Sequence, residues 1–515
     1  MQHMTVADLL TDAAAEHPDK VALVEAEGRA RTWHELDDEV SRVATGLTAA
    51  GVIAGHRVMI AAGNRIEFVT AYLGTQRAQA VAVPVNPRST VEELSRMLAD
   101  SGAKIVFADI DTVAAVRQAL ATLETTPRLF VIGGTLNPGE KSYDHLIAMP
   151  ARSMPAARDA EALATLLYTS GTSGRPRAAM LSHRALLANI EQVGQVRPPM
   201  IGGDDVVLGV LPMFHVYGLN AVLGSVLRQH AKLVLMPRFD PEGALDLIED
   251  EACTVVPVAP AVFGHWLPIE HLDERLGPVR VVLSGSAPLA PEVRERFTAL
   301  SRVPVHQGYG LTEAAPVVTS TLCSVEPAPT SVGAALPGIR IKLVAEGGGT
   351  PDAGDAGEIH IAGDNLFSGY WPDGADGPDE QGWWATGDVG FLDAAGDLSL
   401  VDRIKELVIV SGFNVYPSEV EELIADVAGV ESVAVIGVPD ERTGEAVVAY
   451  VKGAGPAEDL LDRVTARCRE RLARFKQPSR IEIVDELPLT VTGKVQKGRL
   501  RAVERRRALS LLEGE

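Results

Sequence analysis

The feature that most constrains this chain is a repeated alternation of short apolar runs with amphipathic stretches. Parallel strands covered on both faces read as continuous apolar runs, and each needs a crossover helix before the next. One helix is marked at both ends: Thr32 and Glu35 form a capping box ahead of Leu36 and Val40, and Gly51 follows. The pattern predicts βαβ units with strands at Val58–Ala61, Ala80–Val85, Lys104–Ala108, Arg128–Ile132, Val206–Val210, Lys232–Met236, Thr254–Val258 and Val279–Leu283.

The pattern changes near Ser331. Short strands are expected at Ile339–Val344, Glu358–Ala362 and Asp397–Val401, separated by loops rich in Gly and Asp. Beyond Asp402 helices and strands mix again, with a helix beginning at a Ser418–Glu421 capping box. The sequence therefore predicts a β-rich subdomain over residues 331–402 and a separate α+β domain after it.

Composition excludes several classes of protein. Of 515 residues, 46% are apolar, and 47 Lys and Arg stand against 69 Asp and Glu, so the net charge is −22. Such a charge argues against non-specific binding to nucleic acid or anionic membranes. The three cysteines lie far apart, which excludes a disulfide scaffold and fits a reducing compartment. No stretch reads as a signal peptide or a transmembrane helix, so a soluble cytoplasmic protein without integral membrane association is expected.

A loop rich in hydroxyls and glycine is the first candidate for binding chemistry. Tyr168–Arg177 reads YTSGTSGRPR, and Gly171 and Gly174 leave its backbone N–H groups open to an anion. The spacing is not that of a Walker P-loop. On composition alone, a flexible surface loop is an equally good interpretation.

Three further segments carry polar groups suited to catalysis. In Gln307–Glu313, Tyr309 could stack on a base and Glu313 could hold Mg²⁺, although an ordinary turn after a strand is the plainer interpretation. Asp388 is expected to be exposed on a turn, and Lys494 on another. A lone lysine in a basic tail is usually just solvated.

Taken together and in order, these motifs resemble the adenylate-forming superfamily, which includes acyl-CoA synthetases, peptide-synthetase adenylation domains and luciferases. The resemblance covers essentially the whole chain and is greatest for acyl-CoA synthetases of the fatty-acid type. The family's phosphate loop ends in Lys-Gly where this chain has Arg177 and Ala178, so loop mobility is expected to differ. The matching segments are Tyr168–Ala178, Leu211–Leu219, Gly285–Leu289, Tyr309–Glu313, Thr386–Asp388, Asp402–Glu406, Gly412–Glu421 and Pro488–Lys494.

The resemblance implies an α/β fold. Its large N-terminal domain, residues 1–402, would hold two doubly wound α/β sheets and a small β-barrel-like subdomain at 331–402. A small mobile α+β C-terminal domain, residues 403–515, would rotate about a hinge at Asp402.

The resemblance also implies a two-step reaction that uses ATP, Mg²⁺ and CoA. A carboxylic acid would be activated to acyl-AMP and passed to the CoA thiol, giving acyl-CoA, AMP and pyrophosphate. For the first step, the resemblance implies that the β- and γ-phosphates are bound by Thr169, Ser170, Gly171, Thr172, Ser173, Gly174 and Arg177, that Thr312 contacts the α-phosphate, and that Glu313 binds Mg²⁺. Tyr309, flanked by Gly308 and Gly310, would cover the adenine, with Gly285, Ser286 and Ala287 on its other face, while Asp388 and Arg403 would bind the ribose. His215 would lie beside the acyl carboxylate, and Lys494 would bridge that carboxylate and the α-phosphate.

For the second step, the segment at Ser411 and Gly412 would replace Lys494 and line a tunnel for the thiol. Phe475 would contact the CoA nucleotide, and Arg442 and Lys476 would meet its phosphates. Apart from Lys494, the basic C-terminal run Lys494–Arg507 is expected to form a solvated helix.

The acyl pocket implied by the resemblance is mainly apolar, which favours an aliphatic fatty acid. Tyr217 and Asn220 could shorten the pocket, so an aromatic acid stays open. Two other functions also stay open: an acyl-AMP ligase that loads a carrier protein, and a non-catalytic acyl-nucleotide binder. The sequence leaves the oligomeric state undecided, a homodimer included.

Overall fold

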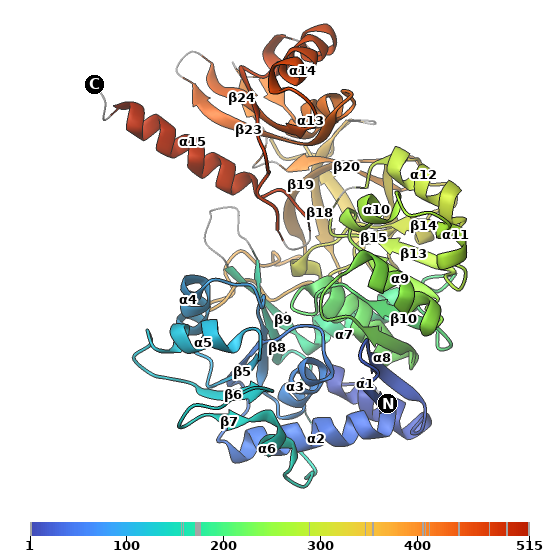
Figure 1. Ribbon diagram of the computed structural model, residues 1–515, viewed down its shortest axis with the longest axis vertical. Coiled ribbons are helices and arrows are strands. Elements are labelled where there is room, and N and C mark those ends of the chain that lie inside the picture. Colours follow the sequence, from blue (N-terminus) through green and yellow to red (C-terminus); the bar gives the residue numbers. More distant parts are fainter. Residues whose placement is uncertain are drawn as a thin grey trace. The chain divides into compact units, whose positions relative to one another are not determined.

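The computed structural model describes residues 3–155, 157, 159–169, 177–287, 289–345, 347–352, 355–403, 406, 408–410, 413–440, 443–472, 474–490 and 493–512. The chain forms two compact units (Figure 1). The first holds most of residues 1–340 together with 362–384. The second holds 341–361 and 385–515. The sequence placed the domain boundary at Asp402, and the hinge there stays a prediction.

Unit 1 contains two seven-stranded, mostly parallel sheets. One has the order β7-β6-β5-β3-β4-β8-β9 and the other β14-β13-β12-β10-β11-β1-β2. Their strands are β1 (Val21–Glu25), β2 (Ala30–Thr32), β3 (Arg57–Ala61), β4 (Val81–Pro84), β5 (Ile105–Asp109), β6 (Arg128–Ile132), β7 (Lys141–Ser142), β8 (Leu163–Thr169), β9 (Arg177–Ser182), β10 (Val206–Gly209), β11 (Lys232–Leu235), β12 (Val255–Val258), β13 (Val281–Ser284) and β14 (Val305–Gln307).

Helices follow most of these strands and cover both faces of each sheet (Figure 1). They are α1 (Val6–Glu16), α2 (Trp33–Ala49), α3 (Ile66–Arg77), α4 (Val91–Ser101), α5 (Val113–Leu120), α6 (Tyr143–Ile147), α7 (His183–Gly194), η1 (Tyr217–Gly224), α8 (Ser225–Gln229), α9 (Pro241–Asp250), α10 (Ala261–Trp266), α11 (Leu272–Arg275) and α12 (Pro291–Ser301). The short elements η2 (Thr312–Ala314), β15 (Thr319–Ser320), η3 (Thr321–Cys323) and β16 (Ser331–Ala335) complete this part of the chain.

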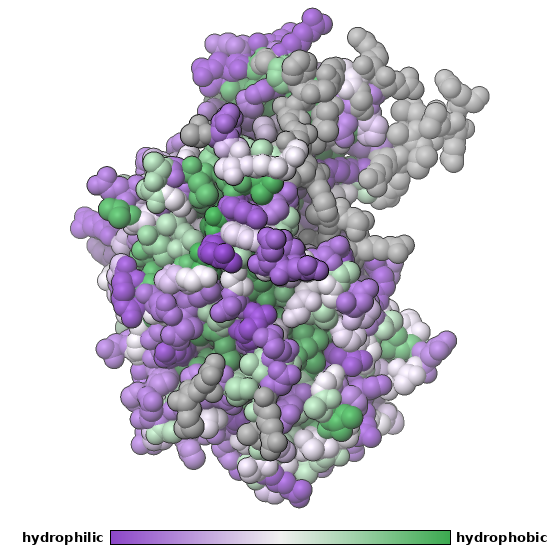
Figure 2. Space-filling model, turned by 180° about the vertical axis from the view of Figure 1, so that it is seen from behind, coloured by the Kyte–Doolittle hydropathy of each residue, from purple (hydrophilic) through white to green (hydrophobic). Residues whose placement is uncertain are grey.

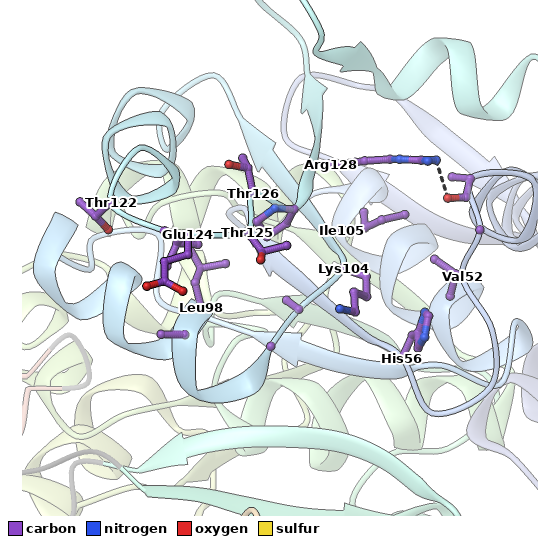
Figure 3. Close-up of a pocket in the computed structure, with 17 residues that line it drawn as sticks. Val52, His56, Leu98, Lys104, Ile105, Thr122, Glu124, Thr125, Thr126 and Arg128 are labelled. Atoms are coloured by element: carbon purple, nitrogen blue, oxygen red, sulfur yellow. Dashed lines mark hydrogen bonds between the residues drawn. The ribbon is translucent and has the colours of Figure 1, made fainter.

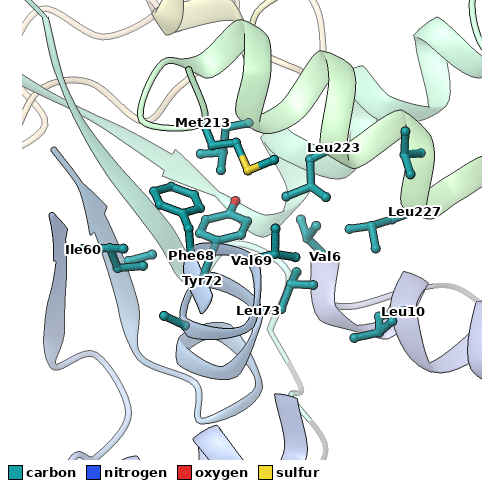
Figure 4. Packing of buried hydrophobic residues seen from close by; sticks show 14 of the residues in the cluster. Val6, Leu10, Ile60, Phe68, Val69, Tyr72, Leu73, Met213, Leu223 and Leu227 are labelled. Carbon is teal, nitrogen blue, oxygen red and sulfur yellow. The ribbon is translucent and has the colours of Figure 1, made fainter. Parts of the chain in front are cut away.

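The alternation of side chains along β3 shows why its run is continuously apolar. Val58 and Ile60 join one buried cluster, while Met59 and Ala61 point to the opposite face and join another. In Figure 4, α3 places Phe68 and Tyr72 in the first cluster, close to Met213. All of these side chains are almost completely buried, so both faces of the strand contribute to the core.

Unit 2 carries two smaller groups of strands. β17 (Arg340–Val344), β18 (Gly357–Ala362), β19 (Trp384–Leu392) and β20 (Leu398–Arg403) lie in the order β20-β19-β18-β17. A second sheet has the order β22-β21-β24-β23, and β25 pairs with β24. Its elements are β21 (Val408–Val410), β22 (Phe413–Val415), α13 (Pro417–Ala425), β23 (Val430–Asp440), β24 (Gly444–Gly453), α14 (Ala457–Arg471), η5 (Arg474–Lys476), β25 (Arg480–Ile483) and α15 (Lys497–Leu512).

The structure confirms the predicted fold class, two doubly wound α/β sheets followed by a small α+β part. Each predicted apolar run named above forms a strand within a residue or two, and the Thr32–Glu35 capping box is present. The paired strands β1 and β2 were not anticipated. Mobility of the C-terminal part stays a prediction.

Two local predictions are wrong. Helix α13 begins at Pro417, so Ser418 lies inside its first turn, where its hydroxyl donates to the Val401 carbonyl instead of capping. Asp388 is not on an exposed turn: it lies within β19 and is 8% exposed. The sequence Thr-Gly-Asp suggested a turn, but pairing with β20 holds it extended.

The surface agrees with the composition. Hydrophilic side chains cover most of the face in Figure 2, and hydrophobic ones show in separate areas between them. Among the described helices, none combines the length and the apolar character that a membrane span requires.

Candidate functional site

Neighbouring parallel strands of unit 1 bring three predicted segments to one edge of a sheet. β13 runs into Gly285–Ala287, β14 into Gly308–Glu313, and β10 into the segment that carries His215. All three strands belong to the β14-β13-β12-β10 part of one sheet. Their carboxyl ends meet at the same edge, which is where open α/β sheets bind ligands.

The turn after β14 is fixed by close backbone approach. Val318 and Thr319 donate their N–H groups to the Tyr309 carbonyl, and the Tyr309 N–H donates to the Thr319 hydroxyl over 3.2 Å. A Cβ at Gly308 or Gly310 would lie 2.4 Å from a backbone oxygen of this facing segment. Only glycine fits on either side of Tyr309, so the aromatic side chain is held by a rigid frame.

Tyr217 packs against the turn after β13. A Cβ on Gly285 would lie 2.8 Å from Tyr217 Cε1, and the Tyr217 hydroxyl donates to the Leu283 carbonyl over 3.2 Å. Burial raises the pKa of Tyr217, so the hydroxyl stays protonated. Next to Gly285, Ser286 has φ of +75°, a left-handed conformation that is uncommon for a residue with a side chain. Strain of this kind is often found at binding sites.

His215 lies half-buried just before η1. Its Nδ1 accepts a hydrogen bond from the Tyr217 N–H over 3.3 Å. Asn220, further along η1, is fully buried, and its amide donates to the carbonyls of Leu186 and Ala315. Asn220 therefore ties η1 to its neighbours, while Tyr217 is the residue that limits space beside Gly285.

Glu313 is the buried carboxylate at this edge, with an exposed fraction of 8%. It lies in η2, where the Phe367 N–H donates to its backbone carbonyl over 2.9 Å. The Tyr370 hydroxyl donates to Glu313 Oε1 over 2.6 Å. A carboxylate oxygen is the hard donor that Mg²⁺ prefers, so the chemistry of this residue fits the predicted metal.

Arg177 is the first residue of β9 and pairs with Thr169 at the end of β8. Its Nη1 lies 2.7 Å from Asp376 Oδ2, and its Cζ lies 3.8 Å from the centroid of the Tyr370 ring. Ala178 follows in the same extended strand, is buried, and has no positive φ. Ala178 therefore needs no left-handed backbone, and the expected difference in loop mobility stays a prediction.

Asp388 and Lys494, two predicted site residues in unit 2, differ in their exposure to solvent. Asp388 is buried in β19, and its N–H donates to the Thr386 hydroxyl over 3.1 Å. Lys494 is exposed on a tight turn, in which the Thr490 N–H donates to the Lys494 carbonyl and the Lys494 N–H to the Thr490 hydroxyl. The turn that the sequence indicated for Lys494 is present, whereas its role stays a prediction.

The residues predicted to meet CoA are only partly described. Phe475 packs against the core of the second sheet in unit 2, and Lys476 forms an ion pair with Glu419 at 2.7 Å. The phosphate-loop residues Ser170, Gly171, Thr172, Ser173 and Gly174 lie outside the described residues, as do Ser411, Gly412 and Arg442. For Arg403, only the backbone pairing with Asp388 is described.

A cavity of about 640 Å³ lies away from these residues (Figure 3). Its lining includes His56, Lys104 and Arg128, which lie at or just before the amino ends of β3, β5 and β6. None of the predicted site residues lines it. It opens at the opposite edge of the sheet from the end of β8, where Thr169 lies.

Among the described residues, Glu16, His17 and His230 have ligand atoms that all lie within 4.8 Å of one another. Glu16 and His17 are exposed, and the Lys20 ammonium donates to the His230 carbonyl over 2.7 Å. That positive charge opposes a cation at this place, so Glu313 is the better candidate for a metal ligand.

Sequence reasoning did not identify Tyr370 and Asp376 as parts of this site. Their segment, SGYWPDGAD, reads as a loop by composition, and its Tyr370 lies 57 residues beyond Glu313. The one usable signal was an aromatic pair, Tyr370–Trp371, inside an otherwise polar loop.

Comparison with known families gives two matches. The family described as AMP-binding enzyme matches residues 10–371, and the AMP-binding enzyme C-terminal domain matches residues 419–494. Together they include the matching segments named above except Thr386–Asp388, Asp402–Glu406 and the first part of Gly412–Glu421.

Similar proteins span nearly the same length. A 4-coumarate–CoA ligase 5 of Oryza sativa subsp. japonica is 34% identical and aligns over 97% of this chain and 94% of its own. A long-chain-fatty-acid–CoA ligase of Bacillus subtilis (strain 168) is 32% identical with the same coverage. The crystal structure of ATP-bound MatB from Rhodopseudomonas palustris aligns with a TM-score of 0.88 at 32% identity, over 98% of this chain and 99% of that one.

Proposed function

The chain belongs to the AMP-binding enzyme family, and from that premise we propose that it is an ATP-dependent acyl-CoA ligase. The observation that carries the proposal is a grouping of residues from both sheets of unit 1. Tyr309 and Glu313 follow β14 in one sheet, Arg177 begins β9 in the other, and Tyr370 contacts both Glu313 and Arg177. An aromatic face, a buried carboxylate and a cation are the groups that a nucleotide triphosphate with its metal requires.

The first step would join two anions, a carboxylate and the α-phosphate of ATP. The site must therefore supply positive charge and fixed donors where negative charge develops. Arg177 would bind the triphosphate, and Thr312 and Lys494 would contact the oxygens around the α-phosphate. Mg²⁺, when bound at Glu313, would supply further positive charge to the phosphate oxygens.

The second step would use a different part of unit 2. Asp388 would keep the ribose in place through both steps, because a buried carboxylate that only accepts hydrogen bonds suits a pair of hydroxyls. Lys494 would withdraw, and the segment at Ser411 and Gly412 would line the path of the CoA thiol. Phe475 would contact the CoA nucleotide. Lys476 is held by Glu419, so it would first have to exchange that partner for a phosphate.

The finer proposal is that the acid is apolar and aliphatic. An unpaired buried charge is costly, and the segments Gly285–Ala287 and η1 contain no lysine or arginine. A second candidate, an aromatic acid, is favoured by one observation. Tyr217 is fixed against Gly285, which shortens the space beyond the turn and offers a ring to stack on.

The test is CoA-dependent AMP formation from ATP over two series of acids, straight chains of increasing length and substituted benzoic and cinnamic acids. We expect activity with an apolar acid and free CoA. Activity only with a carrier protein would instead identify an acyl-AMP ligase. No pyrophosphate release with any acid would identify a non-catalytic binder and contradict the proposal.

The variant Tyr217→Ala decides between the two kinds of acid. If the substrate is aliphatic, removal of the ring extends the preference toward longer chains. If it is aromatic, the same variant loses activity because the stacking surface is gone. Phe239→Ala is the control, because Phe239 is an aromatic side chain that packs on Trp266 in a different buried cluster from Tyr217.

A further inference from the structure

Tyr370 lies between two groups that the proposed function needs, and it touches both. Its hydroxyl is 2.6 Å from Glu313 Oε1, and its ring centroid is 3.8 Å from the Arg177 Cζ. Arg177 is in turn 2.7 Å from Asp376. The side chains of Asp376, Arg177, Tyr370 and Glu313 are therefore connected in that order by direct contacts.

The position of Tyr370 is set by the backbone and not by Glu313. The segment that holds it runs alongside β9: Ser368 N–H donates to the Met180 carbonyl, Met180 N–H to the Gly369 carbonyl, and Trp371 N–H to the Ala178 carbonyl. These three hydrogen bonds place Tyr370 opposite Ala179, two residues along β9 from Arg177. The ring and the guanidinium are thus positioned by the same strand.

Aromatic packing holds the Tyr370 ring from the other side. Phe367 lies edge-on to Tyr370 with centroids 5.0 Å apart, and Trp384 lies edge-on to Phe367 at 5.1 Å. Phe367 also donates its N–H to the Glu313 carbonyl, so the same short segment contacts both backbone and side chain of Glu313. A hydroxyl held in this way can orient a carboxylate, because the donor has little freedom to follow it.

The Tyr370 hydroxyl is the donor in its contact with Glu313, because an ionised carboxylate only accepts hydrogen bonds. The flat guanidinium of Arg177 suits an aromatic face better than an ammonium does, which gives a reason for Arg where the family usually has Lys.

We propose that Tyr370 is a positioning residue that couples the predicted Mg²⁺ ligand, Glu313, to the predicted phosphate-binding cation, Arg177. The proposal rests on the proposed function, because it takes Glu313 as the metal ligand. Loss of the hydroxyl removes one hydrogen bond that orients the Glu313 carboxylate for Mg²⁺. ATP binding then requires more Mg²⁺, while the ATP site itself is intact.

The experiment is equilibrium dialysis of radiolabelled ATP against the purified full-length chain over a series of Mg²⁺ concentrations. Tyr370→Phe should raise the Mg²⁺ concentration at half-maximal ATP binding by about ten- to a hundredfold, the range for losing one hydrogen bond to a charged group. At saturating Mg²⁺ the variant should bind ATP as the wild type does. An unchanged Mg²⁺ requirement, or weaker ATP binding at every Mg²⁺ concentration, would overturn the proposal.

Tyr143→Phe is the matched control. The Tyr143 hydroxyl also donates to a buried glutamate, Glu39, over 2.9 Å, but it lies in α6. This variant should lower thermal stability and leave the Mg²⁺ requirement as in the wild type. If both variants shift the Mg²⁺ requirement equally, the effect is a general loss of stability and the proposal is wrong.

Arg177→Lys tests the contact between the Arg177 guanidinium and the Tyr370 ring. It also provides a test if Tyr370→Phe does not fold. It keeps the charge but not the flat group over the ring, so the Mg²⁺ requirement should rise by a smaller factor than in Tyr370→Phe. No rise would overturn the coupling. A wild-type chain that binds Mg²⁺-ATP but forms no acyl-AMP from any acid would contradict the proposed function and leave the Tyr370 result standing.

Discussion

Glu313 and Lys494 carry the opposite charges of the proposed first step, and their settings differ. Glu313 in unit 1 is buried, fixed by its backbone carbonyl and held by the Tyr370 hydroxyl. Lys494 in unit 2 is exposed on a turn closed by hydrogen bonds to Thr490. Groups needed throughout a reaction benefit from a rigid setting, whereas a group that serves one step must be able to leave.

The largest effect is expected from Lys494→Ala. Removing one preorganised charged contact typically lowers a rate by about 10²–10³. We expect that loss in acid-dependent pyrophosphate exchange, with Lys494→Arg recovering little because a flat fork replaces a compact charge. A solvated lysine without a role would leave the exchange rate unchanged, which would remove one side of the comparison.

Arg177→Ala should have a smaller effect, confined to ATP. Loss of a charged hydrogen-bonding group from the triphosphate should raise the KM for ATP about tenfold, with the KM for the acid little changed. Arg228→Ala is the control, because Arg228 also forms an ion pair with a carboxylate, Glu191 at 3.0 Å, but on the surface of α7 and α8. A change confined to the KM for the acid would show that Arg177 serves the acyl group.

The third effect concerns the stability of unit 1 and not the reaction. His183 begins α7 directly after β9, is 3% exposed, and burial lowers its pKa from 6.5 to about 4. Between these pH values, the unfolded chain therefore binds a proton at His183 that the folded chain does not bind. Stability from this residue is present above pH 6.5 and is lost as the pH falls toward 4, by about 3 kcal/mol in total.

The check for His183 is urea unfolding at pH 7 and pH 4.5. His183→Gln cannot take up the proton, so its free energy of unfolding should fall less between the two pH values than that of the wild type. His271→Gln, at an exposed histidine, should follow the wild type. An identical fall in His183→Gln and the wild type would show that this residue does not titrate as described.

The sequence predicted best what depends on local periodicity. Runs such as Val58–Ala61 became strands because apolar residues on both faces leave no alternative to a doubly covered sheet. The carboxyl-edge position of Tyr309 and Glu313, directly after β14, was not predicted, because no strand was named at Val305–Gln307. Residue chemistry left Mg²⁺ binding at Glu313 as one of two interpretations, the family resemblance favoured it, and the role stays a prediction.

What the sequence missed depends on contacts between distant segments. Tyr370 meets Glu313 because its segment pairs with β9, a register that composition does not reveal. Asp388 was misplaced because a strand that contains Gly387 reads locally as a turn.

The basic C-terminal run was expected to be a solvated helix, and this interpretation was incomplete. Its one acid, Glu504, accepts hydrogen bonds from Tyr450 and Arg480. Burial would raise the pKa of Glu504, but these two partners outweigh it and lower the pKa. Leu500 is buried beside them, and Lys497 lies 2.9 Å from Glu421 and 3.0 Å from Glu406. Helix α15 is therefore held against the sheet of unit 2 by specific contacts.

The most direct test of the two-step account measures the half-reactions separately on Lys494→Ala and Gly412→Leu. The account predicts opposite results. Lys494→Ala should fail to form acyl-AMP yet convert preformed acyl-AMP to acyl-CoA at a near wild-type rate, while Gly412→Leu should form acyl-AMP and fail to use CoA. If each variant loses both half-reactions equally, the two residues do not serve separate steps, and the distinction between a fixed site and an exchanging one is wrong.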